Sequence, residues 1–439
     1  MLTACARYHA RPLSPSAVRR ALREPTHAAL VRAAKRLRMA PLAPIRLDFA
    51  RPLTPRAIGV IAVLANPDLI ALRARARVAT AQVFAAGLLP NPVVSASTLI
   101  PYGTRSSGHT TAYNAGFLWD LSQLFTRPVT LRIARETARA ARFHVAWQEW
   151  VVANQARLLA IRLYWLQKSQ AQAISAGTLA QAYATKIARA AKAKAIPATQ
   201  ASRAQAIALV AEEAAAAYDR RVRRTRLALN AVLGLRPGDH LSLAQPAPPP
   251  LVLSSPRKLF IEAQHDRLDL VALRAAYKSA QGRLERAILG QYPQIGIGLD
   301  AARDNSAIPS AGWQLTLTLP FNGNRGSIAV ARARRAVLYH TYMARLAQDR
   351  AMIYRLYTLL QNYTREIKVL APQEHTFDHL TRAAIAAGYN GALNAQQMLA
   401  IVLRDAIMEE QFNTLRIAQA QSYVGLAVAS GARWQGRRL

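Results

Sequence analysis

Apolar residues recur at helical spacing over two unusually long stretches of the chain. Between about residues 130 and 192 there is no proline and the only glycine is Gly177, and between about 328 and 387 the only proline is Pro372. At a rise of 1.5 Å per residue, each stretch predicts a helix of roughly 90 Å. Both stretches carry a heptad-like apolar seam, which predicts left-handed coiled-coil packing. The seam residues are Val145, Val152, Leu159 and Leu166 in the first stretch, and Ile353, Leu356, Leu360, Tyr363, Ile367, Leu370 and Phe377 in the second.

Each long helix is predicted to end at a turn and to be followed by a second helix that runs back. The breaks are Lys194-Ala195-Ile196-Pro197 and Gly388-Tyr389-Asn390-Gly391. The returning helices are predicted to end at Gly234 and near Gly431, because glycine commonly follows the last turn of a helix. An ordinary dimeric coiled coil would account for these helices, but it would leave the segments before them unexplained.

Short segments with a period of two precede each long helix, which predicts β-strands. In the second half, residues 295–301 alternate, and the apolar Trp313, Leu315, Leu317 and Leu319 alternate with Gln314, Thr316 and Thr318. In the first half, the strands are predicted at about residues 94–100 and 113–121. Two half-buried hairpins of a soluble sheet are one interpretation. Four strands alone have open edges, however, so a closed barrel built from several chains is the other interpretation.

The chain contains an internal repeat. The segment from Asp68 to Ala74 returns as Asp269 to Ala275, an offset of 201 residues (269 minus 68). We therefore predict an extended N-terminal segment (1–55), a first repeat (56–236), a proline-rich linker (237–256), a second repeat (257–431) and a basic tail (432–439). The fold class is mainly α, with long helical hairpins and a small β part.

Composition narrows the class of protein. The formal net charge is +35, with arginine spread along the chain, and no run of about 18 apolar residues predicts a transmembrane helix. A polyanion partner would suit the charge, yet no compact basic module or stacking platform indicates a nucleic-acid protein. No phosphate-binding glycine loop, nucleophile elbow or CxxC pair occurs, so we expect neither an enzyme nor a cofactor.

Two weak candidate sites remain. His375 and His379 lie four residues apart with Glu374 beside them, a spacing that permits metal binding from one helix face, although a solvated face explains it better. Asp300 and Asp304 permit acid–base chemistry, but a polar loop explains them better, because no nucleophile or histidine lies near them in sequence. We therefore expect no metal site and no catalytic site.

The ordered set of features resembles the TolC-like outer-membrane factor family. The resemblance covers about residues 55–431 and rests on several short segments. Each segment alone is weak evidence for the family, but their order along the chain is specific. They are Asn66-Pro67-Asp68-Leu69, Leu89-Pro90-Asn91-Pro92, Leu229 to Gly234, Gln291-Tyr292-Pro293, Leu317 to Phe321 and Gly326 to Ala329.

Cys5 extends the resemblance to the lipoprotein branch, which includes metal and drug efflux channels. Leu2-Thr3-Ala4-Cys5 is similar to the end of a lipobox, whose cysteine is lipidated, and Tyr8 and Pro12-Leu13-Ser14 follow it. The four residues ahead of Cys5 are too few for a secretory signal. Either translation starts further upstream, or Cys5 is an incidental surface thiol.

The resemblance implies a homotrimer with a 12-stranded transmembrane β-barrel, continuous with a helical periplasmic tunnel (α-barrel). Trp313, Leu315, Leu317 and Leu319 would face outer-membrane lipid, and Gln314, Thr316 and Thr318 would line the lumen. The trimer would be a passive efflux duct for drugs or metal ions, supplied by a periplasmic adaptor and an inner-membrane transporter of the RND or ABC type. A type I protein-secretion duct and a soluble polyanion-binding coiled-coil scaffold are the alternatives.

The resemblance places the periplasmic gate and the adaptor-docking site at the hairpin tips, where this chain matches the family at Gly388 but departs from it at other positions. The tip residues in question are Lys194, Gln200, Gly388, Tyr389, Asn390 and Asn394. Gln200 and Asn394 stand where the family would place aspartate, and Lys194 replaces the first-half glycine. The departure argues against a cation-selecting acidic gate, and closure by hydrogen bonds and by packing of Tyr389 is the expectation.

Overall fold

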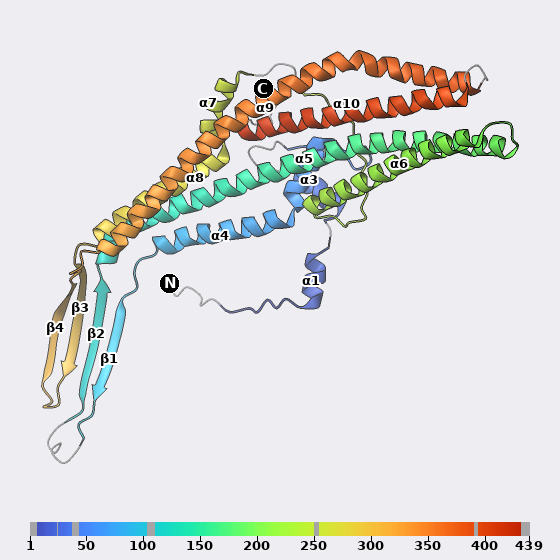
Figure 1. Cartoon of the computed structure of the whole chain (residues 1–439). Helices are drawn as coiled ribbons and strands as arrows, with labels where there is room; N and C mark the ends of the chain where they lie inside the picture. Colours follow the sequence, from blue (N-terminus) through green and yellow to red (C-terminus); the bar gives the residue numbers. More distant parts are fainter. Residues whose placement is uncertain are drawn as a thin grey trace.

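The computed structural model describes residues 7–23, 25–36, 44–102, 110–249, 254–389 and 394–431. They form an elongated molecule, with four strands at one end and two helical hairpins reaching the other end (Figure 1). Shorter helices surround the middle of this length. The architecture is therefore the mainly helical one, with a small β part, that the periodicity predicts.

The structure contains two very long helices, as predicted. Helix α5 (Ser122–Lys192) has 71 residues and α9 (Arg325–Tyr389) has 65, so each extends about 100 Å. Helix α6 (Ala198–Leu233) returns along α5, and α10 (Ala395–Ser430) returns along α9. The first helix begins several residues earlier than predicted, because it continues through Pro128. This proline lies in the second turn, where its missing N–H removes one hydrogen bond.

The strands are also confirmed. Strands β1 (Val93–Leu99), β2 (Ala112–Asp120), β3 (Gln294–Arg303) and β4 (Pro309–Thr318) form one antiparallel sheet in the order β1-β2-β3-β4. Helix α4 (Pro67–Gly87) leads into the first hairpin, and α8 (Leu268–Leu289) leads into the second. Each half of the chain thus supplies two strands and one helical hairpin.

The repeat is visible in atomic detail at the middle of the molecule. Helices α3 (Pro55–Ala65) and α7 (Pro256–Asp266) both begin with a proline behind a hydroxyl cap, Thr54 or Ser255, which lie 201 residues apart. The Arg73 guanidinium donates to the Val63 carbonyl at 2.6 Å, and the equivalent Arg274 donates to the Gln264 carbonyl at 2.7 Å. The two halves therefore form the same bend by the same contact.

The main hydrophobic core lies where α3 packs on α5. Ile58, Val60, Ile61, Ala62 and Val63 of α3 are all buried. The approach is close, because a methyl group at Gly59 would lie 2.9 Å from the Ala153 carbonyl oxygen. Glycine at this position is therefore a packing requirement.

The prediction of an extended N-terminal segment is wrong for part of its length. Helices α1 (Pro15–Ala21) and α2 (His27–Lys35) form there, capped by Ser14 and Thr26. Leu30 and Ala34 of α2 are buried against the main core. Further on, Leu53 pairs in a short parallel bridge with Leu243 of the predicted linker. Helix α2 and the segment around Leu53 therefore belong to the folded middle of the molecule.

Candidate channel surface

The sheet separates its side chains by polarity. Residues opposite each other in the register share a face, and Trp313 pairs with Leu299 while Leu315 pairs with Ile297. Leu299 in turn pairs with Phe117. The apolar positions of three strands therefore lie on one face, together with the predicted lipid-facing Leu317. Gln314, Thr316 and Thr318 lie on the other face, with Gly298, Gly296 and Gln294 opposite them.

No described part of the chain covers the apolar face. Trp313 is 74 % exposed, Leu299 64 % and Leu315 51 %. Leu319, one residue beyond the end of β4, is also exposed. Within the described structure, strands β1 and β4 each have an unpaired edge, since the sheet order is open. A sheet with an exposed apolar face and two open edges needs further partners, which are either lipid, other strands or both.

The helices next to the sheet form a single curved layer in the order α4, α5, α8, α9. Helix α5 packs against both α4 and α8, and α8 packs against α9. The contact between α5 and α8 includes a hydrogen bond between the hydroxyls of Thr137 and Ser279 at 2.9 Å. The outer helices of this layer, α4 and α9, each have a side on which no described helix packs within the layer. The layer has the form of one section of a tube wall.

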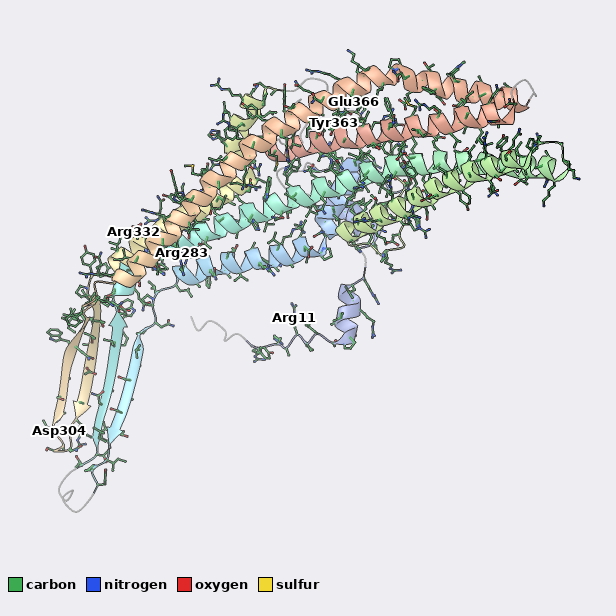
Figure 2. All side chains as sticks on the ribbon, viewed as in Figure 1. Arg11, Arg283, Asp304, Arg332, Tyr363 and Glu366 are labelled. Atoms are coloured by element: carbon green, nitrogen blue, oxygen red, sulfur yellow. The ribbon has the colours of Figure 1, made fainter. Side chains whose placement is uncertain are left out.

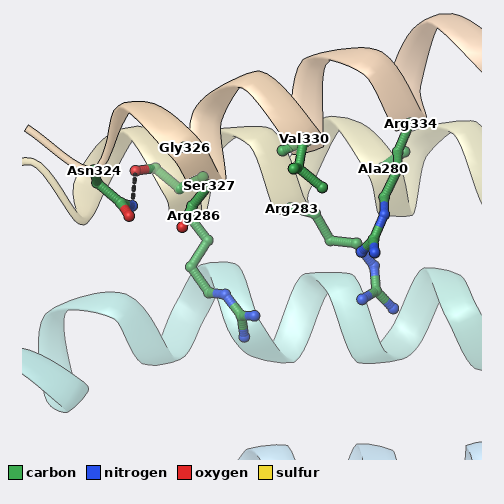
Figure 3. Close-up of a pocket in the computed structure, with 10 residues that line it drawn as sticks. Ala280, Arg283, Arg286, Asn324, Gly326, Ser327, Val330 and Arg334 are labelled. Carbon is green, nitrogen blue, oxygen red and sulfur yellow. Dashed lines mark hydrogen bonds between the residues drawn. The ribbon is translucent and has the colours of Figure 1, made fainter.

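A groove runs along α8 between its two neighbours. Near the sheet it is a cavity of about 580 Å³, lined by Arg283 and Arg286 of α8 and by Ser327, Val330 and Arg334 of α9 (Figure 3). It continues as a cavity of about 590 Å³ that shares Arg283, Val330 and Arg334 and is otherwise lined mainly by small and aliphatic side chains, including Ala276, Ala280, Val337 and Leu338. Sequence reasoning missed this groove, because its arginines are not distinguishable among the 58 basic residues of the chain.

A second feature that the sequence did not predict is a buried cluster of charges where the second repeat bends. Arg267, which is almost completely buried, donates to both carboxylate oxygens of Asp269 at 2.9 and 2.7 Å and to the Ala429 carbonyl at 3.1 Å. Its guanidinium also lies 4.6 Å from the Trp147 ring centroid. Burial opposes ionisation of Asp269, but the hydrogen bonds and charges of Arg267 and Arg345 outweigh it and lower the pKa of Asp269. Arg267 therefore joins α8, α10 and α5.

Asp349 is the unsatisfied member of this cluster. The Arg267 guanidinium lies 2.8 Å from Asp349 Oδ1, yet among the described residues neither carboxylate oxygen accepts a hydrogen bond of good geometry. Burial raises the pKa of Asp349 to about 6, and the opposing charges of Arg267 and Arg345 only partly offset this effect. The folded protein therefore binds a proton at Asp349 more tightly than the unfolded chain does.

This proton gives a pH-dependent prediction. The stabilising contribution of protonated Asp349 is complete below pH 3.8 and is lost as the pH rises through about 6. In Asp349→Asn the position is neutral at every pH, so we expect the variant to gain stability relative to wild type between pH 4 and 7, by on the order of 1–3 kcal/mol. Urea denaturation of both proteins at several pH values measures the difference. A difference that is independent of pH would contradict the assignment.

The hairpin tips pack together through small residues. Ala180 and Ala184 of α5, Ala204 and Ala208 of α6 and Leu399 of α10 form one buried cluster. Gln200, in the first turn of α6, is exposed, and its backbone N–H donates to the Pro197 carbonyl at 3.1 Å. The two helical hairpins therefore meet near their tips.

The second tip is described only in part. Asn394 is the N-cap of α10, and its side-chain oxygen accepts from the Gln397 N–H at 2.8 Å. This cap is a structural role that the sequence analysis did not assign to it. Gly388 and Tyr389 are the last residues of α9. Asn390 and the side chain of Tyr389 lie outside the described structure, so the proposed packing of Tyr389 stays a prediction.

Lys194 adopts a conformation that glycine would adopt more easily. It has φ +56° in the turn between α5 and α6, and its N–H donates to the Ala191 carbonyl. A left-handed conformation costs roughly 1 kcal/mol for a residue with a Cβ. We therefore expect Lys194→Gly to slow amide hydrogen exchange in the tip, with a local stabilisation of about 0.5–1 kcal/mol. Lys186→Gly, a matched change of an exposed lysine inside α5, is expected to accelerate the exchange.

The other candidate residues are separate from these features. Glu374 is paired with Arg416 at 2.9 Å, while His375 and His379 are exposed, and the described residues contain no group of three metal-binding side chains. Asp304 accepts from the backbone N–H groups of Ser306 and Ile308, so it shapes the turn at the far end of the sheet (Figure 2). Cys5 and the basic tail lie outside the described residues.

Among the described helices, no single one has the length and apolar composition to span a membrane. Only the bent pair of α3 and α4 passes such a test when taken together. Much of α3 is buried within the main core, which accounts for its apolar composition.

Known structures have the same fold. The chain superimposes on CusC with a TM-score of 0.68 and 13 % identity, covering 90 % of this chain and 98 % of that one. For the CmeC outer membrane channel of Campylobacter jejuni the TM-score is 0.69 at 13 % identity (86 % and 85 % covered), and for the outer membrane protein VceC of Vibrio cholerae it is 0.66 at 15 % (86 % and 96 % covered). No family model and no curated sequence matches the chain. The chain therefore has the same fold as these outer-membrane channel structures.

Proposed function

We propose that the chain is one protomer of a homotrimeric outer-membrane efflux channel. The observation that carries the proposal is the open four-stranded sheet, with apolar side chains exposed on one face and polar ones on the other. Three copies joined edge to edge give 12 strands, which satisfies every ladder hydrogen bond, as a membrane barrel requires. The curved layers of helices then continue the barrel as a tunnel on the periplasmic side.

Such a channel acts as a passive passage for its substrate. Substrate is delivered by a periplasmic adaptor at the helix tips and by an inner-membrane transporter of the RND or ABC type, and the channel itself consumes no energy source. The substrates in this proposal are small toxic compounds. Cys5, when lipidated, anchors the N-terminal part to the membrane.

The proposal is tested by expressing the chain with a secretory leader, separating the bacterial membranes, and comparing heated with unheated samples in detergent. A heat-sensitive trimer in the outer membrane that conducts ions in planar bilayers is the expected result. A soluble monomer or dimer would overturn the proposal in favour of a coiled-coil scaffold.

A further inference from the structure

The groove beside α8 brings together positive charges that have no ion-pair partner among the described residues. Figure 3 shows Arg283 and Arg334 pointing into the same region, with Arg286 one turn nearer the sheet. Within the part of the chain that the structure describes, none of the three forms an ion pair, and the neighbouring Glu285 is paired with Arg132 instead. Like charges that converge in one cavity repel each other, and a bound anion relieves the repulsion. Guanidinium groups bind carboxylate, sulfate and phosphate oxygens in pairs.

The position of Arg132 shows which face of the helical layer carries the groove. Helix α3 covers α5 beside Ala153 and Arg157. Arg132 precedes Arg157 by 25 residues (157 minus 132), or about seven turns at 3.6 residues per turn, so it lies on that covered face. Its partner Glu285 lies on the same side of the layer. Arg283 precedes Glu285 by two residues, which is about 200° around α8, so it lies on the opposite side.

The face opposite α3 is the lumen of the proposed channel, because helices that cover the other face would fill a lumen placed there. Figure 1 shows α3 and α7 beside the middle of the long helices. Helix α9 begins at Arg325 next to the groove, so the positive end of its dipole adds to the charge there. The three arginines thus form a positive station inside the tube, just below the barrel.

The other end of the tube carries the same sign of charge. No aspartate or glutamate occurs from Trp150 to Ala211 or from His379 to Arg404, two ranges that include the distal ends of both hairpins. Exposed basic side chains are present there instead, namely Lys186, Arg189, Lys192, Lys194 and Arg203. A substrate that enters at the tips therefore meets positive charge first.

We propose that the channel exports anionic compounds, and that Arg283, Arg286 and Arg334 form an anion-binding station in its lumen. This inference rests on the proposed function and names the substrate class. The aliphatic continuation of the groove, lined by Val337 and Leu338, fits anions with an apolar body. A tube with basic side chains in its lumen below the barrel and exposed basic side chains near its entrance concentrates ions of the opposite sign.

The test is the reversal potential of single channels in a planar bilayer under a gradient of potassium chloride. We expect chloride to be more permeant than potassium by about threefold or more. The double variant Arg283→Gln and Arg334→Gln is expected to lower this ratio by at least about twofold. Arg332→Gln is the matched control, because Arg332 lies on the same helix turn as Arg334 but outside the groove (Figure 2).

The outcomes separate the two proposals. A protein that inserts and conducts but prefers potassium, or shows no preference, overturns the anion proposal and leaves the channel intact. An unchanged ratio in the double variant overturns the station. A protein that never conducts contradicts the proposed function itself. If the double variant fails to form the heat-sensitive trimer, Arg286→Gln alone decides the assignment of the station.

Discussion

Leu315→Arg is expected to abolish assembly in the outer membrane. Leu315 lies on the apolar face of β4, where a barrel would present it to lipid. An arginine on a lipid-facing strand position costs about 2–4 kcal/mol near the middle of the bilayer, and a trimer incurs this cost three times. The measurement is the amount of heat-sensitive trimer in the outer-membrane fraction. We expect it to fall below detection.

Thr316→Arg is the matched control, since Thr316 is the next residue of the same strand and faces the other side of the sheet. A polar lumen accepts the charge, so we expect normal amounts of trimer. If both variants assemble, β4 does not face lipid. If only Thr316→Arg fails, the two faces of the sheet are assigned the wrong way round.

Arg267→Met is expected to cost about 3–5 kcal/mol of folding free energy, the largest effect in the helical part. The change leaves the buried carboxylates of Asp269 and Asp349 without their main counter-charge and removes the hydrogen bond to Ala429. The midpoint of urea denaturation, followed by circular dichroism in detergent, measures the loss.

Arg345→Met is the control within the same cluster. Arg345 contacts the same two carboxylates, at 2.9 and 3.5 Å, but its side chain is 35 % exposed. Water replaces part of its interaction, so we expect a loss of about 1 kcal/mol or less. If the two variants lost the same folding free energy, burial of the arginine would not determine how much it stabilises the fold.

Much of the fold was predictable from local patterns. The alternation around Trp313 predicts a strand and its two faces, and the heptad seam through Ile353 and Leu360 predicts a buried stripe, which both residues occupy at 2 % exposure or less. These predictions succeed because period two and period 3.6 follow from backbone geometry alone. The short helices α1 and α2 were missed, although Ser14 before Pro15 and Thr26 before His27 are capping signals.

The functional features were less predictable, because they depend on contacts between distant segments. Arg267 lies two residues before Asp269 in the sequence, but its role arises from Asp349 and Ala429, which belong to other helices. Likewise, Arg283 and Arg334 share a groove only after α8 and α9 pack together. At the second tip, Asn394 was interpreted as a gate residue, and the structure adds a helix cap that composition alone does not reveal.

The open edges of β1 and β4 affect the stability of the free protomer before it assembles. A newly made chain carries two rows of unpaired backbone groups and an apolar sheet face. Such edges join any extended chain they meet, including the wrong one. In the proposed trimer, correct pairing requires three copies, so its rate falls steeply at low concentration, whereas aggregation with other chains does not depend on finding two more copies. We therefore expect the free protomer to be short-lived in the cell, and its yield to depend on holding chaperones that shield the strands until the ring closes.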